Sequence, residues 1–292
     1  MTAVVIVAHH ERTEAAALAR AAADWLLERG HEAWMPTDDA KALSLASLGS
    51  DRLLSEADLA ISMGGDGTML RTVQLLDGAA VPIIGVNVGL LGYLTEVEPP
   101  SLTAALERYF TGRYTVENRM MLVATVERTD TVSTADGGGT HAPLSWRALN
   151  EVVIEKDEPG HTVRLQVCID GAPFTSYAAD GLIVATPTGS TAYSLSARGP
   201  VVSPTHRAVL LTPVSPHMLF DRSLVLDPHE AISIEVIGHR PAVLSVDGRQ
   251  VGHLNDGDIV HFAPAEQSVT FVRFGHRRFH QILKAKFGLT DR

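Results

Sequence analysis

The spacing of apolar residues changes near residue 119, and no other feature of the sequence constrains the fold as strongly. Before that point, short apolar runs typical of strands lie at residues 4–8, 33–35, 59–63 and 81–86. Segments with helical spacing lie between or after them, at residues 13–29, 69–76 and 102–110. Strands that alternate with helices predict a parallel sheet covered on both faces.

After residue 119, strand-like runs follow one another without long helices between them. They lie at residues 121–126, 149–154, 163–169, 182–185, 209–212, 232–236, 242–246 and 269–274. In the run at 163–169, apolar residues alternate with Arg164, Gln166 and Cys168, the pattern of a half-buried strand. This part of the chain is therefore predicted to form an all-β domain, most simply a sandwich.

The length of 292 residues and the apolar content of 45% suit one large domain or two ordinary ones. We predict an α/β domain at residues 1–117 and a β-sandwich domain at residues 118–275. The last segment, 276–292, has a helical pattern and is expected to pack back on the first domain.

Charge and composition exclude several classes of partner. A net charge of −10 argues against nucleic acid or an anionic membrane, because both favour clustered Lys and Arg. The apolar runs are far shorter than the roughly 20 residues of a spanning helix. The run at 4–8 is followed by His9-His10-Glu11-Arg12 and not by a cleavage site, so we expect a cytoplasmic protein.

No metal site is predicted from metal-ligating residues. Cys168 is the single cysteine, which excludes an intrachain disulfide and a zinc site built on several cysteines. The 13 histidines include no His-Glu-x-x-His pattern.

The strongest local signal is the sequence Gly64-Gly65-Asp66-Gly67-Thr68, between the apolar run at 59–63 and the helical pattern at 69–76. A turn from a strand into a helix presents free N–H groups and the positive end of the helix dipole. Glycine lets a phosphate approach the backbone closely. This turn is therefore predicted to bind phosphate.

Asp66 is the unexpected member of this turn, because a carboxylate repels bound phosphates unless it binds a metal or accepts a proton from an attacking hydroxyl. That makes it the candidate catalytic residue; the alternative is that it only shapes the turn. The chain lacks a P-loop, and no Gly-x-Gly-x-x-Gly opens the first helix, which excludes P-loop enzymes and ordinary nicotinamide dehydrogenases.

A longer polar motif carries a more specific resemblance. It reads Asp180-Gly181-Leu182-Ile183-Val184-Ala185-Thr186-Pro187-Thr188-Gly189-Ser190-Thr191-Ala192-Tyr193-Ser194-Leu195-Ser196. With the glycine-rich turn and the motifs at 87–95, 149–151 and 245–248, it makes the chain resemble the NAD kinase family over most of its length. The resemblance implies a Rossmann-like α/β domain with a parallel sheet, followed by an all-β sandwich, α+β overall.

The resemblance also implies roles for individual residues. Asp66 would accept the proton of the ribose 2′-hydroxyl of NAD, Gly67 would lie close to that nucleotide, and Arg71 would lie beside the phosphates. The remaining implied nucleotide contacts are Asn150, Glu151, His161, Asp180, Thr191, Ala192, Tyr193, Ser194, Leu195 and Ser196. From the residues alone, a core ring is favoured for Tyr193 over stacking on a base, and His161 fits an exposed loop.

The implied reaction transfers the terminal phosphate of ATP to NAD, giving NADP and ADP, with a divalent cation, usually Mg²⁺, shielding the phosphate charge. Inorganic polyphosphate is an alternative donor. The family clamp formed by residues 191–196 implies a homo-oligomer, a homodimer or a homotetramer. Arg198 and Arg249 depart from the family pattern, which leaves the contacts near Arg249 and Gln250 open.

Two rival functions share part of this pattern. A lipid or sphingoid-base kinase has the same glycine-rich turn but does not need the motif at 186–196. A dinucleotide-binding sensor without catalysis does not need Asp66 in a complete turn.

Overall fold

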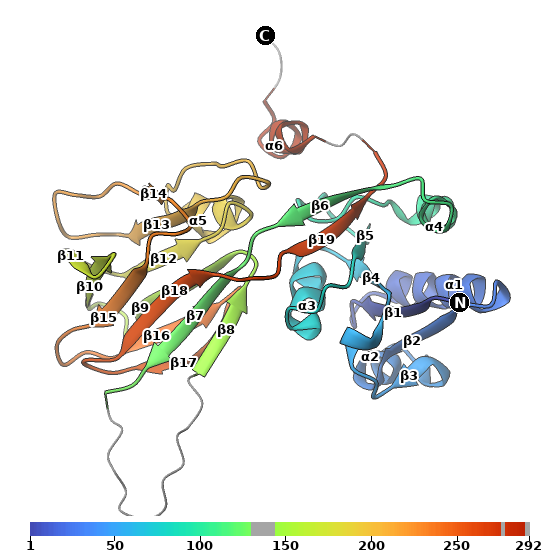
Figure 1. Ribbon diagram of the computed structural model, residues 1–292, viewed down its shortest axis with the longest axis horizontal. Helices are drawn as coiled ribbons and strands as arrows, with labels where there is room; N and C mark the ends of the chain where they lie inside the picture. Colours follow the sequence, from blue (N-terminus) through green and yellow to red (C-terminus); the bar gives the residue numbers. More distant parts are fainter. Residues whose placement is uncertain (130–143, 276–277, 290–292) are drawn as a thin grey trace, which may run out of the picture. The chain divides into compact units, whose positions relative to one another are not determined.

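The computed structural model describes residues 1–129, 144–275 and 278–289. The chain forms two compact units. The first comprises Met1–Arg119 and Gln267–Arg292, and the second comprises Met120–Glu266 (Figure 1). Among the described residues, no helix is long and apolar enough to span a membrane.

The first unit contains a seven-stranded sheet in the order β3-β2-β1-β4-β5-β19-β6. Its strands are β1 (Ala3–Ala8), β2 (Glu32–Pro36), β3 (Gly49–Ser50), β4 (Leu59–Gly64), β5 (Ile83–Asn87), β6 (Thr115–Arg119) and β19 (Val269–Arg273). Neighbouring strands are parallel, except that β19 and β6 are antiparallel. The sheet is thus mostly parallel, as the alternation of strands and helices predicts.

Helices cover both faces of this sheet. The helices of this unit are α1 (Thr13–Glu28), α2 (Thr37–Ala42), α3 (Asp66–Leu76), α4 (Leu102–Phe110) and α6 (Phe279–Lys286), with short 3₁₀ turns at Ala46–Leu48, Leu54–Glu56 and Pro99–Ser101. Ile6 and Ile61 share one apolar cluster with Leu26 of α1 and Leu106 of α4. On the other face, a Cβ added to Gly85 would lie 3.0 Å from the Met69 sulfur of α3.

The second unit contains two antiparallel sheets of six strands each. One has the order β11-β10-β15-β18-β7-β8, with β7 (Leu122–Glu127), β8 (Leu144–Ala148), β10 (Val163–Ile169), β11 (Ala172–Ala179), β15 (Ile232–Val236) and β18 (Ile259–Pro264). The other has the order β14-β13-β12-β9-β16-β17, with β9 (Glu151–Lys156), β12 (Gly181–Ala185), β13 (Val209–Val214), β14 (Leu224–Leu226), β16 (Ala242–Val246) and β17 (Arg249–Leu254). The 3₁₀ turn Gly189–Thr191 and α5 (Tyr193–Ser196) follow β12.

Side chains from both sheets form one core in the second unit. Leu165 and Ile234 come from the first sheet, and Ile154 and Leu244 come from the second. In β10, the residues at every second position are buried and those between them are more exposed, which matches the predicted alternation. The prediction of an all-β sandwich is confirmed, and its layers can be followed in Figure 1.

The predicted boundary at residue 275 is wrong for one strand. The run at 269–274 was assigned to the β-sandwich, but β19 pairs with β5 and β6 in the sheet of the first unit. A strand pattern shows which residues are buried and does not show which strand will be the partner. The chain therefore returns to its first unit before the C-terminal helix, and the second unit ends at Glu266.

The C-terminal helix α6 belongs to the first unit, where the ring of Phe279 lies 6.2 Å from that of Tyr93. Residues 276–277 and 290–292 of the predicted segment lie outside the described residues. The sequence patterns do not predict α2, α5, β3, β6, β8, β11, β14, β17 and β18. Several of these elements are edge strands or lie on the surface, and their sequences lack a continuous apolar face.

Replacing Phe271 tests the place of β19. Phe271 is fully buried between β5 and β6, so Phe271→Ala is expected to destabilise the first unit by about 3–5 kcal/mol. The measurement is the midpoint of denaturant unfolding. Phe174→Ala is the control, because Phe174 is 42% exposed, and an equal loss in both variants would contradict the assignment.

Candidate functional site

The glycine-rich turn lies at the switch point of the parallel sheet. β1 and β4 are neighbours, and Ala8 at the end of β1 pairs with Met63 near the end of β4. Within the sheet, β2 is the neighbour of β1 on one side and β4 is its neighbour on the other. Open α/β sheets bind ligands at such a point, outside the carboxyl ends of the strands.

The turn itself requires glycine at its first position. A Cβ on Gly64 would lie 2.1 Å from the hydroxyl oxygen of Thr68, so a larger residue would displace the first turn of α3. Gly67 is exposed at the start of the helix. Gly67 therefore places no side chain over the first turn of α3, and the start of a helix favours an anion.

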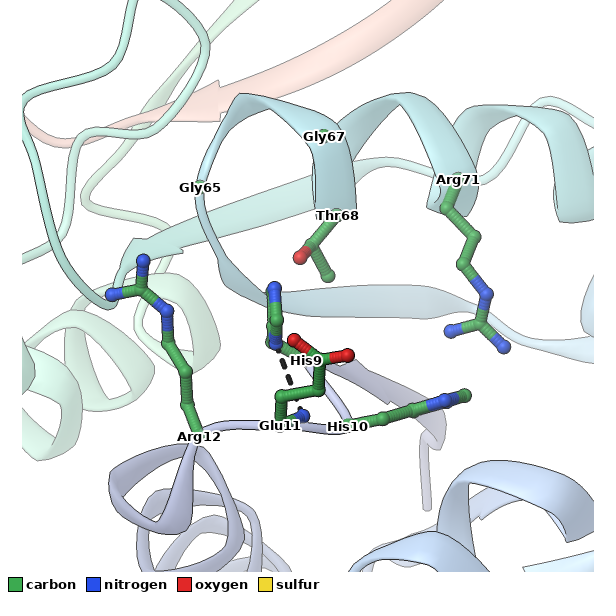
Figure 2. A pocket seen from close by; sticks show the side chains of 8 residues that line it. All are labelled: His9, His10, Glu11, Arg12, Gly65, Gly67, Thr68 and Arg71. Carbon is green, nitrogen blue, oxygen red and sulfur yellow. Dashed lines mark hydrogen bonds between the residues drawn. The ribbon is translucent and has the colours of Figure 1, made fainter. Parts of the chain in front are cut away.

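A pocket of about 510 Å³ opens beside this turn. It is lined by His9, His10, Glu11, Arg12, Gly65, Gly67, Thr68 and Arg71. Figure 2 shows the Arg12 and Arg71 side chains on opposite sides of the turn, with the histidines from the end of β1 between them. The lining is cationic and polar, so the pocket suits a chain of phosphates.

Asp39 of α2 holds two of these side chains in place. Its fully buried carboxylate accepts hydrogen bonds from Arg71 and, at 2.8 Å, from the His10 ring. Burial alone would raise the pKa of Asp39, but the hydrogen bonds from Arg71 and His10 lower it below its usual value. The same bond raises the pKa of Arg71. Arg71 is therefore a fixed cation on the edge of the pocket.

Arg12 is anchored by the backbone that follows β5. Its guanidinium donates to the carbonyl of Val88, and a Cβ on Gly89 would lie 2.0 Å from the same guanidinium. Gly89 also has a φ of 129°, a conformation that favours glycine. Two cations thus reach the pocket from different elements, each with its own anchor.

The Asp66 carboxylate points to a loop and does not cap its own helix. One oxygen accepts the amide of Tyr93 at 2.9 Å and the other accepts the amide of Leu94 at 3.0 Å. A Cβ on Gly92 would lie 2.2 Å from one of these two oxygens, Asp66 Oδ1, so a larger residue here would displace the carboxylate. Each oxygen makes one hydrogen bond and retains a lone pair for a hydroxyl.

A buried ion network supports this loop from behind. Arg273 donates to the carbonyl of Leu94 at 3.0 Å and to Glu117 at 2.7 Å. Glu117 also accepts from Arg119 at 2.6 Å. Burial alone would raise the pKa of Glu117, but the charges of Arg273 and Arg119 lower it. The amides that bind Asp66 are therefore held on a rigid backbone.

In the second unit, Asn150 and Glu151 lie at the start of β9. Glu151 is 6% exposed, and burial followed by the charge of Asp247 raises its pKa to about 8. The amide of Tyr193 hydrogen-bonds its carboxyl group, which brings two predicted site residues together. Within the described part of the chain, Glu151 Oε2 is buried and has no hydrogen-bond partner.

Asp180 and His161 are linked through one lysine. Lys156 donates to the Asp180 carboxylate at 2.6 Å, and Lys156 and His161 both line a cavity of about 320 Å³. His239 and Arg240 line the same cavity. His161 is exposed there, as expected for a residue in a loop.

The segment 191–196 divides into exposed and internal side chains. Tyr193 is 38% exposed, so the alternative of a core ring is wrong. Ser194 is fully buried, and its hydroxyl lies 3.2 Å from that of Thr212. Arg198, which stands where glycine is common in the family, has a φ of 65°, and this conformation explains the preference for glycine.

Sequence reasoning did not identify His9, His10, Arg12, Asp39 or Asp247 as site residues. A signal was available for the first three, because they directly follow a strand beside the one that leads into the glycine-rich turn. An Asp-Gly pair after a strand marks a hairpin turn and says nothing of the contacts of Asp247. No pattern singles out Asp39.

Models of two families match the chain. The ATP-NAD kinase N-terminal domain matches residues 4–114, and the ATP-NAD kinase C-terminal domain matches residues 149–274.

Relatives match over almost the whole length. An NAD kinase of Heliobacterium modesticaldum is 41% identical over 288 residues, 98% of each chain. NAD kinase 1 of Streptomyces avermitilis is 36% identical, covering 100% of this chain and 88% of its own. Yeast NADH kinase complexed with NADH has a TM-score of 0.85 at 24% identity, covering 100% of this chain and 89% of its own. An NAD kinase from Archaeoglobus fulgidus in complex with ATP has a TM-score of 0.73 at 23% identity, covering 97% of this chain and 98% of its own. Fold, family models and relatives agree, and the chain belongs to the NAD kinase family.

Proposed function

We propose that this protein transfers the terminal phosphate of ATP to the 2′-hydroxyl of the adenosine ribose of NAD, giving NADP and ADP. As a member of the NAD kinase family the chain is a phosphotransferase. The observation that carries the proposal is the Asp66 carboxylate, which the amides of Tyr93 and Leu94 hold next to a cationic phosphate pocket.

Asp66 is the proposed proton acceptor. The 2′-hydroxyl must lose a proton as its oxygen attacks the terminal phosphorus of the donor, and a carboxylate within hydrogen-bond reach accepts it. The bond from phosphorus to the bridging oxygen then breaks, and ADP leaves with that oxygen. The amides of Tyr93 and Leu94 orient the carboxylate.

The pocket between Arg12 and Arg71 is the proposed site of the donor phosphates. Among the described residues, its lining includes two arginines and no Phe, Tyr, Trp or large aliphatic side chain, which favours phosphates over a base, and inorganic polyphosphate is proposed as a second donor. Among the described residues, no group of three or more His, Cys, Asp or Glu side chains is placed to hold a metal ion. Mg²⁺ commonly binds through phosphate oxygens and one or two carboxylates, so it fits here as a complex with the donor. Bound there, it would neutralise phosphate charge.

The second unit is the proposed contact surface for NAD. The exposed ring of Tyr193 suits stacking on a base, and Asn150, Glu151 and Asp180 offer donors and acceptors for an adenine edge or a ribose diol. Gly67, His161 and the remaining residues of the 191–196 clamp are proposed nucleotide contacts as well.

We also propose a homodimer or homotetramer in the cytoplasm. Tyr193 and Ser196 are exposed, as a clamp shared between subunits would require before assembly. Cys168 is free, so the fold does not depend on an oxidising compartment. Light scattering coupled to gel filtration measures the oligomer size.

Asp66→Asn tests the proton acceptor. With ATP, Mg²⁺ and NAD, the wild type should form NADP, and the variant should lose about 10²–10⁴-fold in kcat because the amide cannot accept the proton. Affinity for NAD, measured by calorimetry, should change little. Unimpaired turnover of the variant would exclude Asp66 as the base. If the wild type phosphorylated a lipid and neither NAD nor NADH, the proposed function would be overturned.

Gly92→Ala tests the position of the carboxylate rather than its presence. The new Cβ would lie 2.2 Å from Asp66 Oδ1, so the carboxylate must move, and kcat should fall on the order of 10²-fold. Gly252→Ala is the control, because its Cβ has only one neighbour, 3.8 Å away in the side chain of Arg128. Equal kcat in the two variants would show that the site tolerates a displaced Asp66.

Arg71→Met tests the donor pocket. KM for ATP should rise roughly tenfold, because a charge-assisted contact to phosphate is lost while the aliphatic stem remains. The single variant leaves the buried Asp39 without its main partner and should also unfold at a lower temperature. The double variant Arg71→Met/Asp39→Asn should recover stability and keep the high KM. If KM recovers together with stability, the effect of Arg71 is structural.

A further inference from the structure

Asp247 occupies a tight hairpin turn between β16 and β17. Asp247 has a φ of 46° and Gly248 has a φ of 76°, the paired positive values of a two-residue turn with the sequence Asp-Gly. Asp247 is 8% exposed, so its carboxylate lies inside the second unit although it belongs to a turn. A buried carboxylate requires hydrogen-bond donors.

Three consecutive amides supply those donors. The Asp247 carboxylate accepts the N–H groups of Leu149 at 2.8 Å, Asn150 at 2.7 Å and Glu151 at 3.1 Å. The amide of Asp247 in turn donates to the carbonyl of Glu151 at 2.9 Å. The first residue of β9 and the two residues before it are therefore fixed by one side chain.

The strand on the other side of β9 fixes the carbonyls of the same segment. β9 lies between β12 and β16, and Thr186 directly follows β12. The Thr186 amide donates to the carbonyl of Asn150 at 2.8 Å, and its hydroxyl donates to that of Leu149 at 2.5 Å. A Cβ on Gly189 would lie 2.1 Å from the Asn150 carbonyl oxygen, so the loop packs closely on this backbone. The Asn150 side chain is thus presented from a backbone held on both sides.

Asp247 also acts on Glu151 through its charge. Burial raises the pKa of both carboxyl groups, but three amide donors oppose the rise for Asp247, whereas one amide does so for Glu151. Three N–H donors favour the charged form of the Asp247 carboxyl group, and with a pKa of about 8 Glu151 keeps its proton at neutral pH. A protonated Glu151 can donate a hydrogen bond from its carboxyl group to a ligand oxygen or nitrogen.

We propose that Asp247 is a positioning residue for the acceptor nucleotide, which aligns the Asn150 side chain and keeps the neighbouring Glu151 in its proton-donating form. The proposal rests on the proposed NAD kinase function and concerns NAD binding rather than phosphate transfer. Asp247 itself is buried, and it acts on the nucleotide through the backbone of residues 149–151 to which its carboxylate is bonded.

Two variants remove the carboxylate without straining the turn. Asp247→Asn keeps the size of the side chain, and Asp247→Gly suits the positive φ better than any other residue. In both, KM for NAD should rise roughly tenfold or more, because each lost amide bond to a charged group weakens the alignment. The value of kcat should fall less than KM rises, and KM for ATP should not change.

The pH profile distinguishes positioning from general loss of structure. In the wild type, kcat/KM for NAD should fall as pH rises through about 8, where Glu151 loses its proton. Without the charge of Asp247 the pKa of Glu151 is lower, so this limb should move to lower pH in both variants. Glu151→Gln should remove the limb, whether or not Asp247 is present.

Asp170→Asn is the matched control. Asp170 precedes Gly171 in a turn of the same kind between β10 and β11, has a φ of 51°, and accepts the amide of Ala231 at 2.9 Å. It should leave KM for NAD and the pH profile as in the wild type. Wild-type KM and profile in both Asp247 variants would overturn the proposal, and so would an equal effect of Asp170→Asn. Absence of NADP formation by the wild-type protein would overturn the proposed function instead.

Discussion

Main-chain amides at the ends of strands need acceptors, and in this protein aspartate carboxylates supply them from distant parts of the chain. Asp66 binds the amides of Tyr93 and Leu94, and Asp247 binds those of residues 149–151. Charged acceptors make shorter and stronger hydrogen bonds than carbonyls do. Each aspartate therefore holds a backbone segment of its own unit in place.

The two aspartates differ in what remains available to a ligand. Each oxygen of Asp66 carries one amide, and Asp66 is only half-buried, so the carboxylate can still accept a hydroxyl. Asp247 is almost fully buried and accepts hydrogen bonds from three amides, so its proposed role is to position other residues. Burial therefore separates the two aspartates: Asp66 has the exposure that its proposed catalytic role needs, and Asp247 does not.

Local electrostatics oppose the charge of the whole chain. The protein carries a net charge of −10, yet the pocket beside α3 is bordered by two arginines, two histidines and the positive end of a helix, with Glu11 as its one carboxylate among the lining residues. Asp39 neutralises part of this charge from within and keeps Arg71 in one orientation. A fixed cation binds phosphate with a smaller loss of side-chain entropy than a mobile one.

The sequence by itself determined the class of each unit and the location of the glycine-rich turn, because these follow from the period of apolar residues and from glycine at a strand-to-helix junction. It also determined the family, because the family's motifs occur in the expected order along the chain. The tertiary structure decided that β19 returns to the first sheet, since a strand pattern does not choose its partner. It also decided the contacts of Asp39 and Asp247, because a carboxylate that binds amides or cations far away in the sequence leaves no periodic mark. The residues proposed to contact the ligand belong to motifs, whereas the residues that hold them in place are recognised only when the chain is folded.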